Sequence, residues 1–177
     1  IHIRCGEQVS KLDIQNKKVT LHSGEELEGE RIITTIPWIC LKELKGLPTE
    51  MQEAVKSLRS SSIETRYVPG RLDTKAQWIY EPDPAKLVRH NFLEGSRGYW
   101  LETRVERTGL YSDQEQTFCY ENEYAYPLNT IGKPELMKKL LSFCEKEGVY
   151  GLGRWGEHSH YNSDLVVEKT MELADRL

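Results

Sequence analysis

The segment Gly153-Arg154-Trp155-Gly156 places one arginine between two glycines, a few residues ahead of a predicted helix. Glycines let the backbone approach a ligand closely, and the free N–H groups and dipole of a helix N-terminus favour an anion. A guanidinium adds paired hydrogen bonds to phosphate oxygens. The segment therefore predicts a phosphate or pyrophosphate contact at Arg154, with a surface arginine in a turn as the alternative.

The glycines at 151, 153 and 156 also match the spacing GxGxxG, but their surroundings do not fit a Rossmann fingerprint. That fingerprint needs a helix directly after the glycines and an acidic residue about 20 residues further on. Here several polar and aromatic residues separate Gly156 from the helix predicted after Asn162, and Leu177 ends the sequence. We therefore expect the N-terminal Rossmann domain of a dinucleotide enzyme to be missing from these residues.

Two further residues could act on a substrate. Arg89 lies in a strand-like run, where a buried guanidinium needs a partner or a wet cleft, and an exposed strand face is the alternative. Tyr126 precedes Pro127 and offers a hydroxyl and a stacking ring, or else packs in a core. His158 and His160 are two apart, but no set of carboxylates or cysteines at ligand spacing completes a metal site, so none is predicted.

Composition excludes several classes of function. The net charge is -4 with 29% charged residues, so there is no basic field for nucleic acid or an anionic membrane. No apolar run reaches the roughly 18 residues of a membrane span, and the N-terminus lacks the pattern of a signal peptide. The four cysteines are scattered, which is typical of reduced thiols in a cytoplasmic protein.

The elements that must position these residues predict an α+β fold, mostly an antiparallel β-sheet with flanking helices. Residues 1–37 predict a β-meander with turns at Asn16-Lys17 and Ser23-Gly24, and Pro37 stops its last strand. A short helix is expected at 37–44. Pro and Gly clusters separate the strands that we predict in the middle of the chain, which favours an antiparallel sheet. These strands are 62–68, 76–80, 86–93, 99–105 and 117–126.

Three longer helices are predicted. The first, 50–59, begins with a capping-box pattern at Thr49 and Gln52. The second, 134–147, has Pro134 in its first turn and Gly148 as its stop, and a short strand follows at 149–152. The last is 163–177. Its predicted buried side consists of Leu165, Val166, Met171 (or Thr170), Leu173 and Ala174.

Three segments together resemble the C-terminal portion of FAD-dependent enzymes of the amine oxidase and protoporphyrinogen oxidase type. The closest resemblance is to their UDP-galactopyranose mutase-like members. The segments are Arg31-Ile-Ile-Thr-Thr-Ile-Pro37, Trp78-Ile-Tyr-Glu-Pro-Asp-Pro84 and the run from Gly151 to Asp164. The resemblance implies a fragment of a two-domain flavoprotein. In it, residues 1–37 belong to the FAD domain, 38–130 form a substrate-facing antiparallel sheet domain, and 131–177 return to the FAD domain.

The resemblance also implies roles for individual residues. On the cofactor side these are Thr35, Pro37, Gly153, Arg154, Trp155, Gly156, Asn162 and Asp164; on the substrate side they are Arg89, Tyr126 and His160. Family members place an arginine like Arg89 toward the flavin and the substrate phosphate. His158, His160 and Ser163 depart from the family pattern, which has an aromatic residue, a tyrosine and a methionine there.

The function implied for the intact protein is flavin chemistry on a small molecule such as a nucleotide sugar. The chemistry is either hydride abstraction or the redox-neutral ring contraction of a sugar, which would serve cell-surface polysaccharide synthesis. FAD belongs to the intact protein, and we expect the fragment to bind it weakly or not at all. The alternative is a stand-alone, non-catalytic β-rich module that binds a ligand or a protein.

Overall fold

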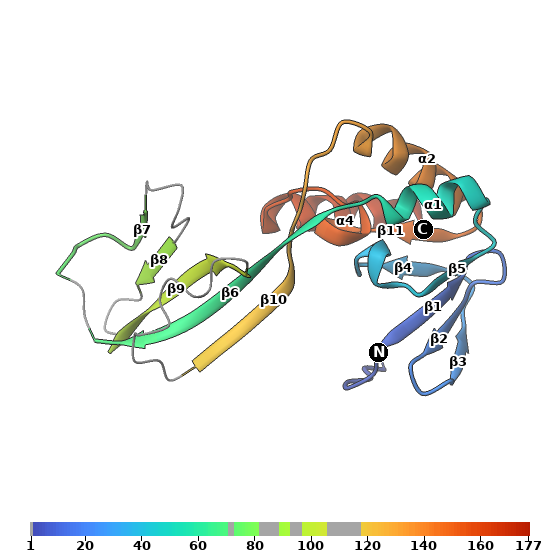
Figure 1. Ribbon diagram of the computed structural model, residues 1–177. Coiled ribbons are helices and arrows are strands. Elements are labelled where there is room, and N and C mark those ends of the chain that lie inside the picture. The colour runs from blue at the N-terminus through green and yellow to red at the C-terminus, as the bar shows by residue number, and fades with distance from the viewer. Residues whose placement is uncertain (1, 71–72, 82–88, 93–96, 106–117) are drawn as a thin grey trace. The chain divides into compact units, whose positions relative to one another are not determined.

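The computed structural model describes residues 2–70, 73–81, 89–92, 97–105 and 118–177 (Figure 1). The chain divides into two compact units. Unit 1 comprises residues 1–59 and 127–177, and unit 2 comprises residues 60–126. The chain thus leaves unit 1 once and returns to it once.

Unit 1 contains a four-stranded sheet in the order β3-β2-β1-β5. Its strands are β1 (Val9–Asp13), β2 (Lys18–Leu21), β3 (Glu26–Glu28) and β5 (Glu43–Lys45). The first three form a meander, as predicted for this part of the chain, whereas β5 pairs parallel to β1. The last strand of the predicted meander is not part of it, because β4 (Ile32–Thr34) lies in another sheet. Of the helix predicted at 37–44, only the short 3-10 helix η1 (Trp38–Cys40) forms, and the rest of the prediction is wrong. Leu44 instead lies in strand β5, as a buried residue between two exposed ones.

A second, two-stranded sheet in unit 1 joins distant parts of the sequence. Strand β4 (Ile32–Thr34) pairs parallel with β11 (Val149–Gly151), so that Ile32 lies opposite Val149 and Thr34 opposite Gly151. Gly148, at φ +78°, ends the helix before β11 in the left-handed conformation that glycine adopts without strain.

Helices α1 (Thr49–Lys56) and α2 (Lys133–Lys146) are confirmed within one to three residues of the predicted ends. The predicted capping box does not form, because Gln52 donates its side-chain amide to the Leu47 carbonyl oxygen at 2.7 Å. Both helices and both sheets contribute to one apolar core. Its buried members are Leu12, Ile14, Trp38, Leu41, Leu44, Leu47, Val55, Leu58, Met137, Leu140, Cys144 and Val149.

The last helices are α3 (Gly153–Gly156), a single turn, and α4 (Ser163–Arg176). The predicted buried side of α4 is largely wrong. Leu173 is buried, but Leu165, Met171 and Ala174 are exposed. Apolar spacing predicted the helix correctly, although within the described residues only a narrow stripe of it meets the core of unit 1.

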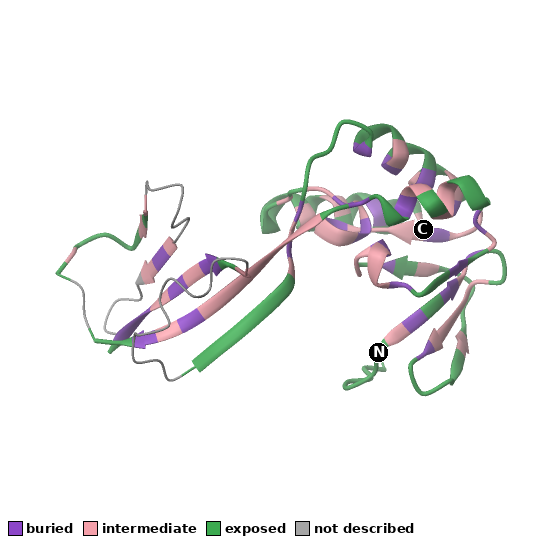
Figure 2. Cartoon of the chain, viewed as in Figure 1, coloured by how far each residue is buried: buried purple, intermediate pink, exposed green. Residues whose placement is uncertain are grey.

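Unit 2 is a five-stranded sheet in the order β10-β6-β9-β8-β7. The strands are β6 (Ser60–Pro69), β7 (Trp78–Tyr80), β8 (Arg89–Phe92), β9 (Gly98–Arg104) and β10 (Phe118–Pro127). The pairs β6–β9, β9–β8 and β8–β7 are antiparallel. Strand β9 alternates between buried and half-buried residues, whereas the first part of β10 is exposed (Figure 2).

The α+β class with an antiparallel sheet is therefore confirmed. The units divide at 59–60 and 126–127, whereas the sequence placed the boundaries at 37–38 and 130–131. The difference at the first boundary has a clear physical cause. Residues 38–59 supply Trp38, Leu41, Leu44 and Val55 to the core of unit 1.

Candidate functional site

Two segments predicted to contact a cofactor lie side by side in unit 1. Parallel pairing of β4 with β11 brings them together. The Leu152 amide then donates to the Thr34 carbonyl oxygen at 2.9 Å, and the Trp38 indole N–H donates to the Gly156 carbonyl oxygen at 2.7 Å. Thr35 and Pro37 thus lie in a connection whose two ends are both hydrogen-bonded to residues 152–156.

The glycines of this segment serve close backbone packing. A Cβ on Gly156 would lie 2.2 Å from the Thr34 carbonyl oxygen, and one on Gly151 would lie 2.3 Å from the Gly156 carbonyl oxygen. Gly153 has φ +75°, which favours glycine. The GxGxxG spacing therefore reflects how tightly the turn packs on β4.

Arg154 braces the loop that leads to α4. Its Nη2 and Nε both donate to the Tyr161 carbonyl oxygen, at 2.9 Å and 3.3 Å. The side chain is half-buried in this arrangement. These two bonds fix the direction in which the guanidinium points.

The remaining predicted cofactor residues surround this loop. Asn162 is the N-cap residue of α4, as expected, but its side chain caps no backbone N–H. Asn162, Asp164 and Thr35 are exposed. Trp155 is half-buried, and its ring meets the His158 ring edge-on at a centroid distance of 5.8 Å. His160, assigned to the substrate side, is an exposed residue of the same loop.

His158 is the buried centre of this region, with no exposed surface. Its Nε2 bonds the Arg59 carbonyl oxygen at 3.1 Å, and its own carbonyl oxygen accepts a bond from the Lys133 ammonium at 3.1 Å. Burial lowers the pKa of His158, and the nearby Lys133 lowers it further. The histidine is thus a neutral clamp between the loop, the end of α1 and the start of α2.

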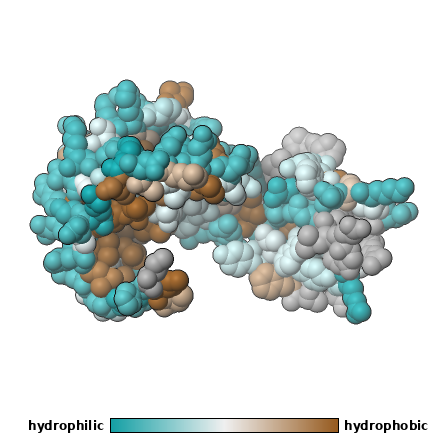
Figure 3. Space-filling model, turned by 180° about the vertical axis from the view of Figure 1, so that it is seen from behind, coloured by the Kyte–Doolittle hydropathy of each residue, from teal (hydrophilic) through white to brown (hydrophobic). Residues whose placement is uncertain are grey.

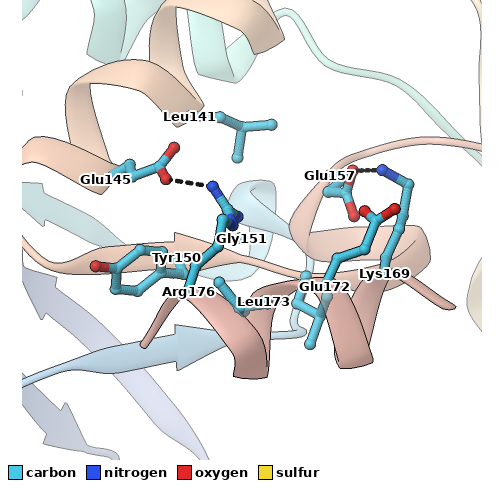
Figure 4. A pocket seen from close by; sticks show the side chains of 10 residues that line it. Leu141, Glu145, Tyr150, Gly151, Glu157, Lys169, Glu172, Leu173 and Arg176 are labelled. Carbon is cyan, nitrogen blue, oxygen red and sulfur yellow. Dashed lines mark hydrogen bonds and ion pairs between the residues drawn. The ribbon is translucent and has the colours of Figure 1, made fainter. Parts of the chain in front are cut away.

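Two cavities in unit 1 contain none of the predicted cofactor residues. The first, of about 180 Å³, is lined from α2, β11 and α4 (Figure 4). Its cations are paired, Arg176 with Glu145 at 2.8 Å and Lys169 with Glu157 at 3.0 Å. Its volume lies below the roughly 300–1,000 Å³ of ligand pockets. The second, of about 410 Å³, has an aliphatic floor beside Trp38, with Lys42, Lys56 and Arg59 in its lining.

In unit 2, Arg89 and Tyr126 belong to one electrostatic group. Arg89 forms an ion pair with Glu102, directly opposite on β9. Asn91 donates to the other oxygen of the same carboxylate at 2.8 Å. Burial works against the charged form of Arg89, but hydrogen bonding to Tyr80 and the charges of Glu102 and Tyr126 outweigh it and raise the pKa.

Sequence reasoning missed Trp38, His158 and Glu102 as parts of these sites. Glu102 opens a sign-alternating run, 102–107, that is typical of a solvated face, yet the register places it against Arg89 and only 20% of its side chain is exposed. Trp38 directly follows Pro37, the residue predicted to end a strand, and this position could have marked Trp38 as part of the site. Nothing in the local pattern marks His158 as fully buried.

Neither a metal centre nor a membrane span is found in the described part of the chain. Residues 2–70, 73–81, 89–92, 97–105 and 118–177 hold no group of three His, Cys, Asp or Glu side chains that could bind a metal ion. Across those same residues, every helix is too short or too polar to cross a bilayer.

No family model and no curated protein sequence matches the chain. Among solved structures, the fold is similar to that of a reduced UDP-galactopyranose mutase, with a TM-score of 0.67 and 20% sequence identity. The match covers 87% of this chain and 41% of the mutase chain, so the chain spans less than half of that protein. A protein from Pyrococcus furiosus matches at a TM-score of 0.43 and 16% identity over 69% of this chain and 38% of its own, which is too low to support an argument. The comparison shows that this chain has a fold similar to that of part of the mutase chain.

Proposed function

We propose that this chain is the C-terminal, flavin-contacting and substrate-binding portion of a FAD-dependent enzyme of the UDP-galactopyranose mutase-like type. Unit 1 contributes the surface that meets FAD, and unit 2 contributes the sheet that meets the substrate. The observation that carries the proposal is the contact between residues 34–38 and 152–156. These two segments are 118 residues apart at Trp38 and Gly156, yet both were assigned to the cofactor from sequence.

The two-stranded sheet supports a larger parent protein. Parallel strands are normally covered on both faces and belong to wider sheets, because a pair alone is marginally stable. In the described structure, β4 pairs with β11 alone, and Ile33 of β4 is 49% exposed. Val167 and Met171 of α4 are exposed as well, and apolar surface gathers on the face of unit 1 shown in Figure 3. These exposed apolar side chains are what we expect if a Rossmann domain packs over them in the parent protein.

In this proposal FAD supplies the redox chemistry, and the protein positions it. Thr35, Pro37 and the 153–156 turn present backbone groups to the cofactor, and Arg154 presents a guanidinium held by Tyr161. Arg89 and Tyr126 act on the substrate, for which a nucleotide sugar is the proposed class. The proposed reaction is either hydride abstraction or a redox-neutral ring contraction. The proposed location of the protein is the cytoplasm, and the proposed pathway is polysaccharide synthesis.

Arg154→Ala should lower the flavin content of the full-length protein that contains this chain. Loss of a charge-assisted bond costs on the order of 1.5–3 kcal/mol, or roughly 10- to 150-fold in affinity. Arg154→Lys should recover part of it, because lysine lacks the forked donor set. The measurement is flavin absorbance per protein after purification, with melting temperature recorded in parallel.

The control is Arg31→Ala, which removes an exposed arginine just ahead of β4, at the end of the strand away from Thr35. Equal flavin content in all three variants and the wild type would remove Arg154 from the cofactor surface. A full-length protein that binds no flavin at all would instead favour a non-catalytic binding module. The exposed aromatic side chains of unit 2 give that alternative its support.

A further inference from the structure

The larger cavity of unit 1 is built from one continuous segment, residues 38–59. Its walls come from η1, the link that follows it, strand β5, helix α1 and the two residues that end the segment. The cavity measures about 410 Å³, within the roughly 300–1,000 Å³ that is typical of small-molecule sites. None of its lining residues was assigned to the cofactor or to the substrate.

The floor of this cavity is aliphatic. Trp38 lies beside it, and its own side chains are Ile39, Leu41, Leu44, Val55 and Leu58. The polar atom of the Trp38 ring is already used, because the indole N–H donates to the Gly156 carbonyl oxygen at 2.7 Å. A sugar or a nucleobase would lose hydrogen bonds to water on such a floor, whereas an alkyl chain has none to lose.

The rim of the cavity is cationic. Three exposed residues of the lining carry positive charge: Lys42, Lys56 and Arg59. Within the described residues, Lys42 and Arg59 form no ion pair. Positive charge therefore gathers at one edge of an aliphatic floor, in a chain whose net charge is -4.

The nearby acidic residues leave most of this charge uncancelled. Glu43, which also lines the cavity, is paired with Lys11 of the neighbouring strand β1 at 2.9 Å. Lys56 pairs with Glu53 at 2.6 Å, but the two side chains are 70% and 65% exposed. Pairs as exposed as this contribute little, and an incoming anion can compete with them.

An aliphatic floor under a cationic rim matches a ligand with an apolar chain and an anionic head. A carboxylate accepts charge-assisted hydrogen bonds from lysine and arginine, and each methylene that is buried behind it adds affinity. A protein partner fits less well. A stable protein interface takes about 20–30 residues a side, and eleven residues line this cavity.

We propose that this cavity binds a single-chain amphiphile with an anionic head, namely a medium-chain fatty carboxylate. The alkyl chain lies on the aliphatic floor, and Lys42, Lys56 and Arg59 hold the carboxylate. The occupant then contacts Trp38, the residue whose indole is bonded to the 153–156 turn. Occupancy is therefore observable at the Trp38 indole.

The test follows the indole N–H signals of the 177-residue chain in two-dimensional NMR. Trp38 reports on the cavity, and Trp78 and Trp100 of unit 2 are internal controls. The probes are decanoate, acetate and decyltrimethylammonium, each below its critical micelle concentration. Decanoate should shift the Trp38 signal saturably and leave the controls unmoved. Acetate, which lacks the chain, should not shift it, and decyltrimethylammonium, with the opposite head charge, should bind at least roughly fivefold more weakly than decanoate.

Chain length tests the floor. In the series hexanoate, octanoate and decanoate, each added methylene should tighten binding by up to roughly fourfold, the effect of burying one CH₂ group. Ile39→Ala, which removes part of the floor, should weaken decanoate more than hexanoate, because the longer chain covers more of it.

Charge variants test the rim. Lys42→Ala and Arg59→Ala should each weaken decanoate by up to roughly fivefold. The double variant Lys42→Glu with Arg59→Glu should bind decyltrimethylammonium more tightly than decanoate. Lys138→Ala is the control, because it removes an exposed lysine of α2 outside the cavity, and it should change neither affinity. The melting temperature of each variant confirms its fold.

Three results with the 177-residue chain would overturn the proposal. They are equal affinity for decanoate and decyltrimethylammonium, affinity that does not depend on chain length, and a Trp38 signal that no probe moves. Cosedimentation with phosphatidylglycerol vesicles, without a response to decanoate, would also overturn it and would assign the rim to a membrane surface.

The decanoate titration is repeated on the full-length protein that contains this chain, where Trp38 should respond in the same way. Loss of the response there would show that another part of that protein covers the cavity, and the proposal would be wrong. None of these measurements depends on flavin, so a failure here is distinct from a failure of the proposed cofactor site.

Discussion

His158 combines complete burial with a backbone at φ +47°, a conformation that non-glycine residues rarely adopt. Residue 158 joins three segments that are far apart in sequence. Its ring contacts the Arg59 carbonyl oxygen and the Trp155 ring, and its backbone carbonyl oxygen accepts a hydrogen bond from Lys133. A charged imidazole would have to be desolvated beside the Lys133 ammonium, whose own pKa is lowered by burial. The region therefore depends on the neutral form of His158.

This dependence predicts a loss of stability in weak acid. The folded pKa of His158 lies below its ordinary value, so the unfolded state binds the extra proton first as the pH falls. The free energy of unfolding should drop from about pH 6.5 downward, by at most about 1.4 kcal/mol per pH unit, until the folded pKa is reached. Urea unfolding at pH 7 and pH 5 measures the change.

His158→Gln is the matched variant, because its amide can still donate to the Arg59 carbonyl oxygen but cannot be protonated. Its stability should fall less between pH 7 and pH 5 than that of the wild type. His90, whose pKa is also lowered by burial, is present in both proteins and cancels in the comparison. The same pH dependence in both proteins would show that His158 is not the group that titrates.

At the scale of elements, regular periodicity was the reliable signal. Helix α2 was predicted closely because Leu140 and Cys144 repeat at helical spacing between Pro134 and Gly148. Strand β5 was not, since three residues carry too little pattern and its partner β1 is about 30 residues away. The contact between the two segments that were predicted to meet a cofactor was likewise invisible to local pattern, because it depends on the parallel pairing of β4 with β11.

That pairing leaves no room for a side chain at the turn, so Gly156→Ala should destabilise unit 1. The new Cβ would meet the Thr34 carbonyl oxygen at 2.2 Å, a backbone atom that a rotamer change cannot move away. Overpacking of this kind costs about 1–3 kcal/mol, and a shift of several degrees in melting temperature is expected. Thermal unfolding followed by circular dichroism gives the value.

Gly132→Ala provides the control, because a Cβ there has no heavy atom within 4 Å and the backbone, at φ -80°, suits any residue. It should be neutral or stabilising by up to about 1 kcal/mol. A Gly156→Ala protein as stable as Gly132→Ala would mean that residues 151–156 do not pack on β4 as described.

At the scale of the whole molecule, unit 2 is an insertion between two parts of unit 1. The sequence predicted this leave-and-return order, since it assigned both ends of the chain to one domain and the middle to another. Its first boundary, 37–38, differs from the division at 59–60, because the spaced apolar residues between Leu41 and Leu58 do not reveal which core they enter. To predict which face of the unit 2 sheet is exposed, the strand register would also have been needed.

The 177-residue chain alone should bind FAD only weakly. Its proposed FAD surface is open, because Thr35, Asn162 and Asp164 are exposed and the two cavities described above include no predicted cofactor residue. Ligand sites usually enclose most of the ligand surface, so these residues alone should bind FAD weakly. We expect a dissociation constant above roughly 10 μM, equivalent to less than about 7 kcal/mol, from a titration followed by flavin fluorescence. The full-length protein should bind far more tightly, with Arg154→Ala lowering the affinity in both. Submicromolar binding by the 177 residues would mean that they enclose the flavin by themselves, and the division of the cofactor site between this chain and a Rossmann domain would be wrong.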